Sequence, residues 1–215
     1  MNKHFVLAIL SLVLGMLACQ TKEQRQVKIK TQLPVLGFKD LNEQGDTLYH
    51  TIPDFAFMDQ DSMLVTPATF EGKVYVADFF FTSCPTICPR MKAQMLRLYE
   101  HFKDEPRVAF LSHSIDPEYD QVPVLKAYAE KLEISASRWH LVTGDKTEIY
   151  SIAKSYFENA AEDPNEPGGF IHSGAFYLVD TQRRIRGYYN GVDPAEVDQL
   201  MADIQVLLHE DQSAQ

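Results

Sequence analysis

Apolar residues along this chain recur at two different spacings, which separate predicted strands from predicted helices. Residues 74–81 are apolar almost throughout, which is typical of a central β-strand that is covered on both faces. From residue 86 to residue 102, apolar side chains recur every three or four positions and indicate one face of a helix. The members of this face are Ile87, Met91, Met95, Leu98 and Phe102. A buried strand that leads directly into an amphipathic helix is therefore the strongest local signal.

The same two spacings predict an α/β fold for the rest of the chain, with a β-hairpin extension at its N-terminal end. Two short strands at 33–38 and 46–52 flank a turn at Asn42 and Gly45, and a second small hairpin joins 54–58 to 62–65. Further strands are predicted at 107–115, 139–143, 175–179 and 185–189. Further helices are predicted at 122–132, from Asp145 to 156 and from Pro194 to 209, and a turn-rich loop spans 160–169. This alternation predicts a central sheet with helices on both faces.

The first 19 residues are predicted to be a signal rather than part of the fold. Residues 5–14 form an apolar run that is too short for a spanning helix and ends near Ala18 and Cys19. A small residue directly before a cysteine is typical of a bacterial lipoprotein cleavage site. Lipidation of Cys19 would anchor the protein on the extracytoplasmic (periplasmic) face of a bacterial membrane. Plain secretion and an uncleaved anchor are the alternatives.

A length of 215 residues fits one domain with short terminal segments. Residues 20–32 are polar and predict a flexible tether, residues 33–209 form the domain, and residues 210–215 are predicted to be a disordered tail. The formal net charge is −10 and the chain has no cluster of Lys and Arg, which argues against a nucleic-acid partner.

The candidate chemistry lies at the junction of the buried strand and the helix after it. Cys84 and Cys88 flank this junction, where free backbone N–H groups and the helix dipole stabilise a thiolate. Their spacing places the Cβ atoms about 5–6 Å apart in a helix, whereas a relaxed disulfide needs about 3.5–4.5 Å. We therefore expect a disulfide that forms with some unwinding and is readily reduced. Two thiolates also suit a soft metal ion, Cu(I) or Zn(II). The plain alternative is a pair of small buried side chains.

A metal site needs a third ligand, and His172 is the best candidate among the seven histidines. It follows a segment with Gly168 and Gly169, which can bring the imidazole close to another loop without steric cost. His113, at the end of a predicted strand, is the second candidate. The other histidines are predicted to lie in the signal, late in a helix, in the tail or at the surface: His4, His101, His209, His50 and His140.

Three segments of the sequence together resemble the SCO/SenC family. They are Phe81-Thr82-Ser83-Cys84-Pro85-Thr86-Ile87-Cys88-Pro89, Ser114-Ile115-Asp116-Pro117 and Phe170-Ile171-His172-Ser173. The resemblance implies a thioredoxin-like (peroxiredoxin-like) fold from about residue 55 to 208. It also implies copper, as Cu(I) or Cu(II), bound through the sulfurs of Cys84 and Cys88 and a nitrogen of His172. Asp116 would act close to the site, behind the ligands or in partner contact, or else it is only a turn residue.

The resemblance further implies a role at the binuclear copper centre of cytochrome c oxidase subunit II, by delivering copper or by keeping thiols reduced. Another extracytoplasmic cuproprotein or thiol protein is the alternative partner. The chain departs from the family pattern at Ser83, Thr86 and Ile171, where many members have His, Asp and Asp.

These departures leave three functions to compare. Copper delivery is favoured, and an extracytoplasmic thiol–disulfide oxidoreductase is the alternative, which the missing acidic groups favour. A peroxidase or redox sensor ranks third, because Arg90 is the only nearby cation in sequence.

Overall fold

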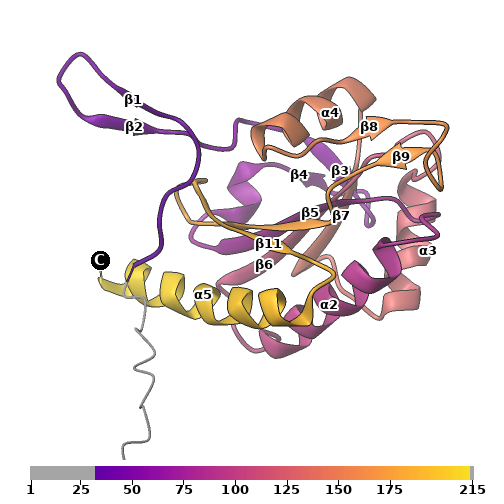
Figure 1. Cartoon of the computed structure of the whole chain (residues 1–215). Coiled ribbons are helices and arrows are strands. Elements are labelled where there is room, and N and C mark those ends of the chain that lie inside the picture. Colours follow the sequence, from indigo (N-terminus) through magenta and orange to yellow (C-terminus); the bar gives the residue numbers. More distant parts are fainter. Residues whose placement is uncertain (1–31, 214–215) are drawn as a thin grey trace, which may run out of the picture. The chain divides into compact units, whose positions relative to one another are not determined.

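A computed structural model describes residues 32–213 of the chain (Figure 1). The signal predicted at 1–19, with its lipidated Cys19, lies outside the described residues, and so does the predicted tether except for Gln32. No helix within the described range has both the length and the apolar character needed to cross a membrane.

A seven-stranded mixed sheet forms the centre of the domain, in the order β11-β10-β5-β6-β7-β3-β4. Its strands are β3 (Phe57–Asp59), β4 (Leu64–Val65), β5 (Val74–Phe80), β6 (Val108–Ser114), β7 (Trp139–Thr143), β10 (Ala175–Val179) and β11 (Ile185–Asn190). The neighbours β5, β6 and β7 are parallel, whereas β3 and β10 pair antiparallel with the two sides of this parallel core. Every residue of the three central parallel strands is buried, which explains their nearly continuous apolar sequences.

Helices cover both faces of the sheet, as the sequence predicts. They are α2 (Cys88–His101), α3 (Val122–Leu132), α4 (Lys146–Ser155) and α5 (Pro194–Ser213), with a short 3₁₀ helix η1 (Pro67–Phe70). Phe80 packs against Tyr128 of α3, while its neighbour Phe79 packs against Tyr156 at the end of α4. Because successive strand residues point to opposite faces, α3 and α4 lie on opposite sides of the sheet (Figure 1).

The predicted N-terminal hairpin is present, but its strands are shorter than expected. It joins β1 (Lys39–Leu41) to β2 (Thr47–Tyr49) in antiparallel register. The Asn42 side chain accepts hydrogen bonds from the backbone N–H groups of Gln44 and Asp46 and closes the turn. Residues 33–38, predicted as a strand, contain no strand. Instead the Leu36 N–H donates to the carbonyl of Ile185, so the segment runs beside the edge of the sheet.

The structure differs from the prediction at two places, the end of the last helix and the loop 160–169. The last helix was predicted to end at 209 and be followed by a disordered tail, but α5 continues to Ser213. Glu210 accepts a hydrogen bond from the Leu33 N–H at 2.7 Å and pairs with buried Arg186 at 2.7 Å. In the predicted loop 160–169, β8 (Ala161–Glu162) pairs with β9 (Phe170–Ile171). Two-residue strands are too short to produce a detectable spacing of apolar residues.

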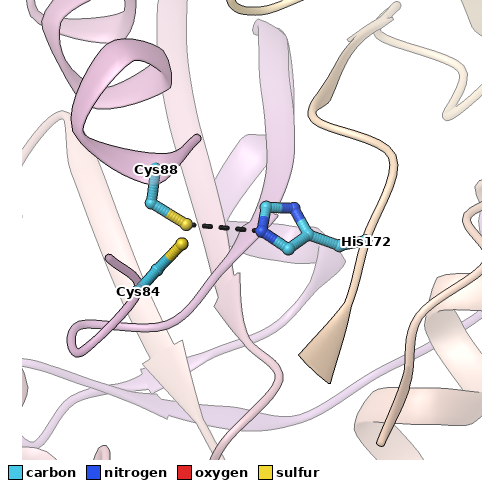
Figure 2. A group of neighbouring side chains, drawn as sticks. All are labelled: Cys84, Cys88 and His172. Carbon is cyan, nitrogen blue, oxygen red and sulfur yellow. Dashed lines mark hydrogen bonds between the residues drawn. The ribbon is translucent and has the colours of Figure 1, made fainter. Parts of the chain in front are cut away.

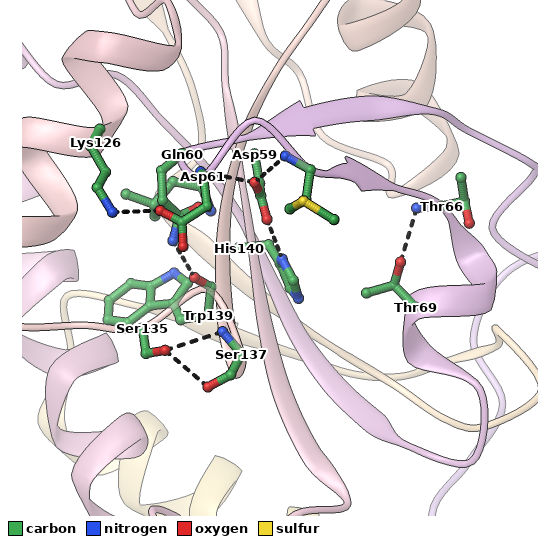
Figure 3. Close-up of polar contacts among 12 residues, drawn as sticks. Asp59, Gln60, Asp61, Thr66, Thr69, Lys126, Ser135, Ser137, Trp139 and His140 are labelled. Carbon is green, nitrogen blue, oxygen red and sulfur yellow. Dashed lines mark hydrogen bonds and ion pairs between the residues drawn. The ribbon is translucent and has the colours of Figure 1, made fainter.

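Side chains add to the backbone pairing that attaches the edge hairpin β3–β4 to β7 (Figure 3). The Gln60 amide donates to the carbonyl of Trp139 and accepts from the N–H of Leu141, so a side chain continues the ladder. Buried Asp59 accepts a hydrogen bond from His140 Nδ1 at 2.9 Å. His140 was predicted to lie at the surface or in a turn, but it is buried in β7 as the partner of this carboxylate.

Candidate metal centre

Cys84 and Cys88 lie where β5 gives way to α2, as predicted. The loop 81–87 joins the two elements, and α2 begins at Cys88, two residues later than the sequence predicted. Pro89 is accommodated in the first turn because a helix has no partner for the N–H group there. Ile87, which precedes the helix, makes no side-chain cap, and its carbonyl accepts from the N–H groups of Arg90 and Met91.

A buried carboxylate fixes the start of this loop. Asp120 accepts hydrogen bonds from the backbone N–H of Thr82 at 3.0 Å, from the Thr82 hydroxyl and from the Ser114 hydroxyl at 2.6 Å. Thr82 lies two residues before Cys84, so the contact restrains the approach to the first thiol. Asp120 is fully buried, and burial of this polar group is tolerated because three donors satisfy its oxygens.

Asp116, for which the sequence leaves open a role near the ligands, a partner contact or a turn, lies in a turn in the structure. Its half-buried carboxylate is hydrogen-bonded to the backbone of Tyr119, and its backbone carbonyl accepts from the N–H groups of Tyr119 and Asp120. The residue therefore shapes a turn, and the nearby Asp120 makes the contact with the cysteine loop. Sequence reasoning missed Asp120 because a carboxylate after a turn predicts a solvated surface group.

His172 is distant from the cysteines in sequence and lies on the segment that follows β9. Gly168 lies so close to the cysteine loop that a Cβ atom there would be 2.8 Å from Phe81 Cε2 and 3.1 Å from Pro85 Cδ. The predicted reason for glycine in this segment, close approach to another loop, is therefore present at Gly168. The rings of Phe170 and His172 then pack against Phe81, with centroid distances of 5.0 and 6.0 Å.

The three predicted ligand residues converge on one point (Figure 2). One donor atom each from Cys84, Cys88 and His172 lie within 4.8 Å of one another. His172 Nε2 is 3.3 Å from Cys88 Sγ, and the sulfur of Cys84 points toward the same space (Figure 2). Sulfur and nitrogen ligands bind d¹⁰ ions at about 2.0–2.3 Å. A single ion between these donors would therefore require only small movements.

The thiols of the pair differ in their surroundings. Both are free and buried, and the predicted disulfide is not formed in this structure. Burial opposes ionisation of Cys84, but hydrogen bonds from the Cys88 thiol and from the N–H groups of Thr86 and Cys88 outweigh it and lower the pKa of Cys84. Burial, with Cys84 alongside, raises the pKa of Cys88 well above its ordinary value. Cys84 is thus the thiol that ionises first.

Burial lowers the pKa of His172, although the charge of Glu158 acts in the opposite direction. The imidazole is therefore neutral at neutral pH, which is the form that binds metal ions.

A cavity of about 250 Å³ lies beside Cys84 and His172 and is also lined by Thr86, Glu166 and Phe170. The cavity leaves one side of the cluster accessible. The Thr86 hydroxyl, where many members of the resembled family carry a carboxylate, is 3.7 Å from Cys84 Sγ.

Two residues that the sequence analysis considered, His113 as a metal ligand and Arg90 as a cation beside the thiols, make their contacts elsewhere. His113 is fully buried in β6 among aromatic rings and stacks on Phe79 at 4.8 Å. Neither of its ring nitrogens has a hydrogen-bond partner within the described chain. Arg90, the cation considered for peroxidase chemistry, donates to the backbone carbonyl of Val192. These placements favour the cysteine–histidine cluster as the functional centre.

Comparison with known proteins gives one consistent result. The SCO1/SenC family model matches residues 43–209. A SCO1 protein homolog of Bacillus subtilis is 35% identical over 162 residues, which cover 74% of this chain and 84% of the homolog. The span matched by the family model contains Cys84, Cys88 and His172.

Solved structures agree in fold. A SCO1/SenC family lipoprotein from Bacillus anthracis has a TM-score of 0.68 and 33% identity, over 74% of this chain and 95% of that one. BsSco, described as a cytochrome c oxidase assembly protein with a disulfide switch, has a TM-score of 0.65 and 34% identity, over 74% and 93%. Copper-bound ScoI of Arabidopsis thaliana has a TM-score of 0.62 and 25% identity, over 73% and 98%.

Proposed function

Because the chain belongs to the SCO1/SenC family, we propose that it binds copper through Cys84, Cys88 and His172 and delivers it to the binuclear copper site of cytochrome c oxidase subunit II. The observation that carries the proposal is the convergence of two sulfurs and one imidazole nitrogen within 4.8 Å. The copper-bound structure of the Arabidopsis relative supports the choice of metal.

The donor set suits copper as a cargo that must be released. Two sulfur ligands favour soft Cu(I), and one neutral imidazole completes a three-ligand site without adding charge. The low pKa of Cys84 provides a thiolate first, whereas the Cys88 thiol ionises only when a cation or base is present to stabilise it. The cavity on the Cys84–His172 side provides the open face through which an acceptor's ligands reach the ion.

Competition between the reduced full-length chain and a chromogenic Cu(I) chelator tests copper binding. We expect one Cu(I) per chain and a loss of affinity of more than about tenfold in Cys88→Ser and in His172→Ala. Ser83→Ala, a change at the exposed residue beside Cys84, is the matched control and should bind as the wild type does. Equal affinity of Cys88→Ser and the wild type would contradict the proposal.

Delivery is tested separately, by mixing the Cu(I)-loaded chain with the reduced copper domain of subunit II. Transfer should load the acceptor and leave this chain metal-free. A chain that binds Cu(I) but never transfers it would restrict the function to copper binding and point to another extracytoplasmic acceptor.

A second candidate function, thiol–disulfide exchange, is favoured by the difference between the two thiols. The Cys84 thiolate would attack a partner disulfide and form a mixed disulfide while one partner thiolate leaves. Cys88 would then lose its proton and attack Cys84 Sγ, which forms the Cys84–Cys88 disulfide, releases the second partner thiol and transfers two electrons to the partner. The disulfide switch of BsSco supports this chemistry. Exchange with an oxidised subunit II domain, absent in Cys84→Ser, is the test.

We also propose that lipidated Cys19 holds the domain on the extracytoplasmic (periplasmic) face of a bacterial membrane. The lipoprotein from Bacillus anthracis supports this assignment. Detergent phase partition of the native protein is the measurement. The wild type should enter the detergent phase and carry the added mass of lipid on Cys19, whereas an unmodified Cys19 in the membrane-bound protein would contradict lipidation.

A further inference from the structure

The imidazole of His172 has only one of its two nitrogens engaged. Nε2 faces Cys88 Sγ at 3.3 Å, whereas Nδ1 is buried and has no hydrogen-bond partner within residues 32–213. Metal-binding histidines are usually oriented by a hydrogen bond to the second nitrogen. Because that bond is missing, the ring direction depends on its packing against Phe81 and on the backbone that carries it.

The buried carboxylate of Glu158 binds the residue that follows His172, Ser173. Glu158, which follows α4, accepts a hydrogen bond from the Ser173 N–H at 2.8 Å and another from the Ser173 hydroxyl at 2.5 Å. The Tyr177 hydroxyl in β10 donates to the same carboxylate at 2.8 Å. Glu158 is only 4% exposed, and its own N–H donates to the carbonyl of Ala153 in α4. The carboxylate therefore ties Ser173 to both a helix and a central strand.

We propose that Glu158 is a positioning residue for His172 and acts through Ser173. Both hydrogen-bond donors of Ser173, its N–H and its hydroxyl, are engaged by Glu158, so the direction of the Cα–Cβ bond of the preceding residue is restrained. Gly174, with a φ of 74°, then turns the chain into β10 without strain. The inference rests on the proposed copper site and adds a residue outside the ligand set on which its preorganisation depends.

The test compares Glu158→Gln with a matched variant elsewhere. Asp203 is also a buried carboxylate that accepts a hydrogen bond from a tyrosine, Tyr189, at 2.8 Å, but it pairs β11 with α5. Asp203→Asn therefore changes a similar buried carboxyl group whose hydrogen bonds to Tyr189 and Gln199 lie in another part of the domain. In the reduced full-length chain, Glu158→Gln should lower Cu(I) affinity by about tenfold or more, while Asp203→Asn should not.

A double-mutant cycle separates positioning from general destabilisation. If Glu158 acts through the imidazole, Glu158→Gln causes no further loss of affinity in a His172→Ala background. Should Glu158→Gln fail to fold, Ser173→Ala removes only the hydroxyl contact and should show the same dependence on His172. As a spectroscopic signature, the Cu(II) electron paramagnetic resonance signal of Glu158→Gln should lose its nitrogen coupling.

The outcomes distinguish this inference from the proposed function. Wild-type affinity in Glu158→Gln, or an equal loss with and without His172, would overturn the positioning role while leaving copper binding intact. If the wild type itself bound Cu(I) no better than Cys88→Ser, the copper site would fail first.

Discussion

Gly168 lies against the ring of Phe81 so closely that no side chain fits between them. A Cβ atom at Gly168 would be 2.8 Å from Phe81 Cε2, well inside the distance of about 3.5–4.0 Å at which carbon atoms make favourable contact. Phe81 begins the cysteine loop, and Gly168 belongs to the segment that leads to His172. This contact therefore controls how closely the two parts of the candidate site approach each other.

Gly168→Ala should push these two segments apart and weaken Cu(I) binding. Gly169→Ala is the matched control, since both glycines have positive φ angles, 89° and 85°, but a Cβ at Gly169 meets no atom within 4 Å. Each variant should lose about 1 kcal/mol of unfolding free energy from the left-handed backbone. Only Gly168→Ala should also lower Cu(I) affinity in chelator competition. Equal affinities in the two variants would contradict the role of the contact.

Asp120→Asn should destabilise the domain far more than Asp116→Asn. Asp120 is buried and accepts three hydrogen bonds that link Thr82 to Ser114, whereas the half-buried Asp116 carboxylate contacts the backbone of its own turn at Tyr119. The expected costs in urea unfolding are about 2–3 kcal/mol for Asp120→Asn and no more than about 0.5 kcal/mol for Asp116→Asn. The reverse order would mean that Asp116 holds the loop.

Buried His113 should make the domain sensitive to mild acid. Burial lowers its pKa to about 3, while the unfolded chain has an ordinary value near 6.5. The unfolded state therefore binds more protons between these values, so this contribution to stability is complete above about pH 6.5. It falls by up to about 1.4 kcal/mol per pH unit as pH drops toward 3.

The measurement is the difference in unfolding free energy between pH 7 and pH 5. In His113→Phe this difference should shrink by about 2 kcal/mol, because the phenyl ring cannot be protonated. Any repacking cost of the variant cancels, since it is present at both pH values. His101→Phe, at an exposed position of α2, should keep the wild-type difference. An unchanged difference in His113→Phe would exclude His113 as its source.

The contribution of Asp78 to the free energy of unfolding should have the opposite dependence on pH. Burial in β5 raises the pKa of this carboxyl to about 7, with Glu158 adding to the rise and a hydrogen bond with Ser112 opposing it. The folded state binds this proton more tightly than the unfolded state does. The resulting contribution to stability is therefore complete below about pH 4 and is lost as pH rises through 7. Asp78→Asn should therefore lose less stability than the wild type between pH 5 and pH 8 in urea unfolding. Exposed Asp104→Asn should behave as the wild type, and an equal loss in Asp78→Asn would contradict the buried proton.

The sequence alone determined the local elements and the residues that meet at the site. The bounds predicted for α3 and β7 agree with the structure, because an apolar face at helical spacing and a short apolar run each report local burial. The positions of Cys84 and Cys88 at the end of a buried strand, and of His172 after a glycine-containing segment, were likewise visible in the sequence.

Only the tertiary structure decided which polar groups support these elements. The sequence pattern singles out none of Asp120, Glu158 and Glu210, yet each is held by donors from elsewhere in the chain, and for Glu210 the partner Leu33 is 177 residues away. The spacing of apolar residues contains no information about such pairs. A buried charge is tolerated only where the fold provides its donors, so its role can be recognised only once those donors are in place.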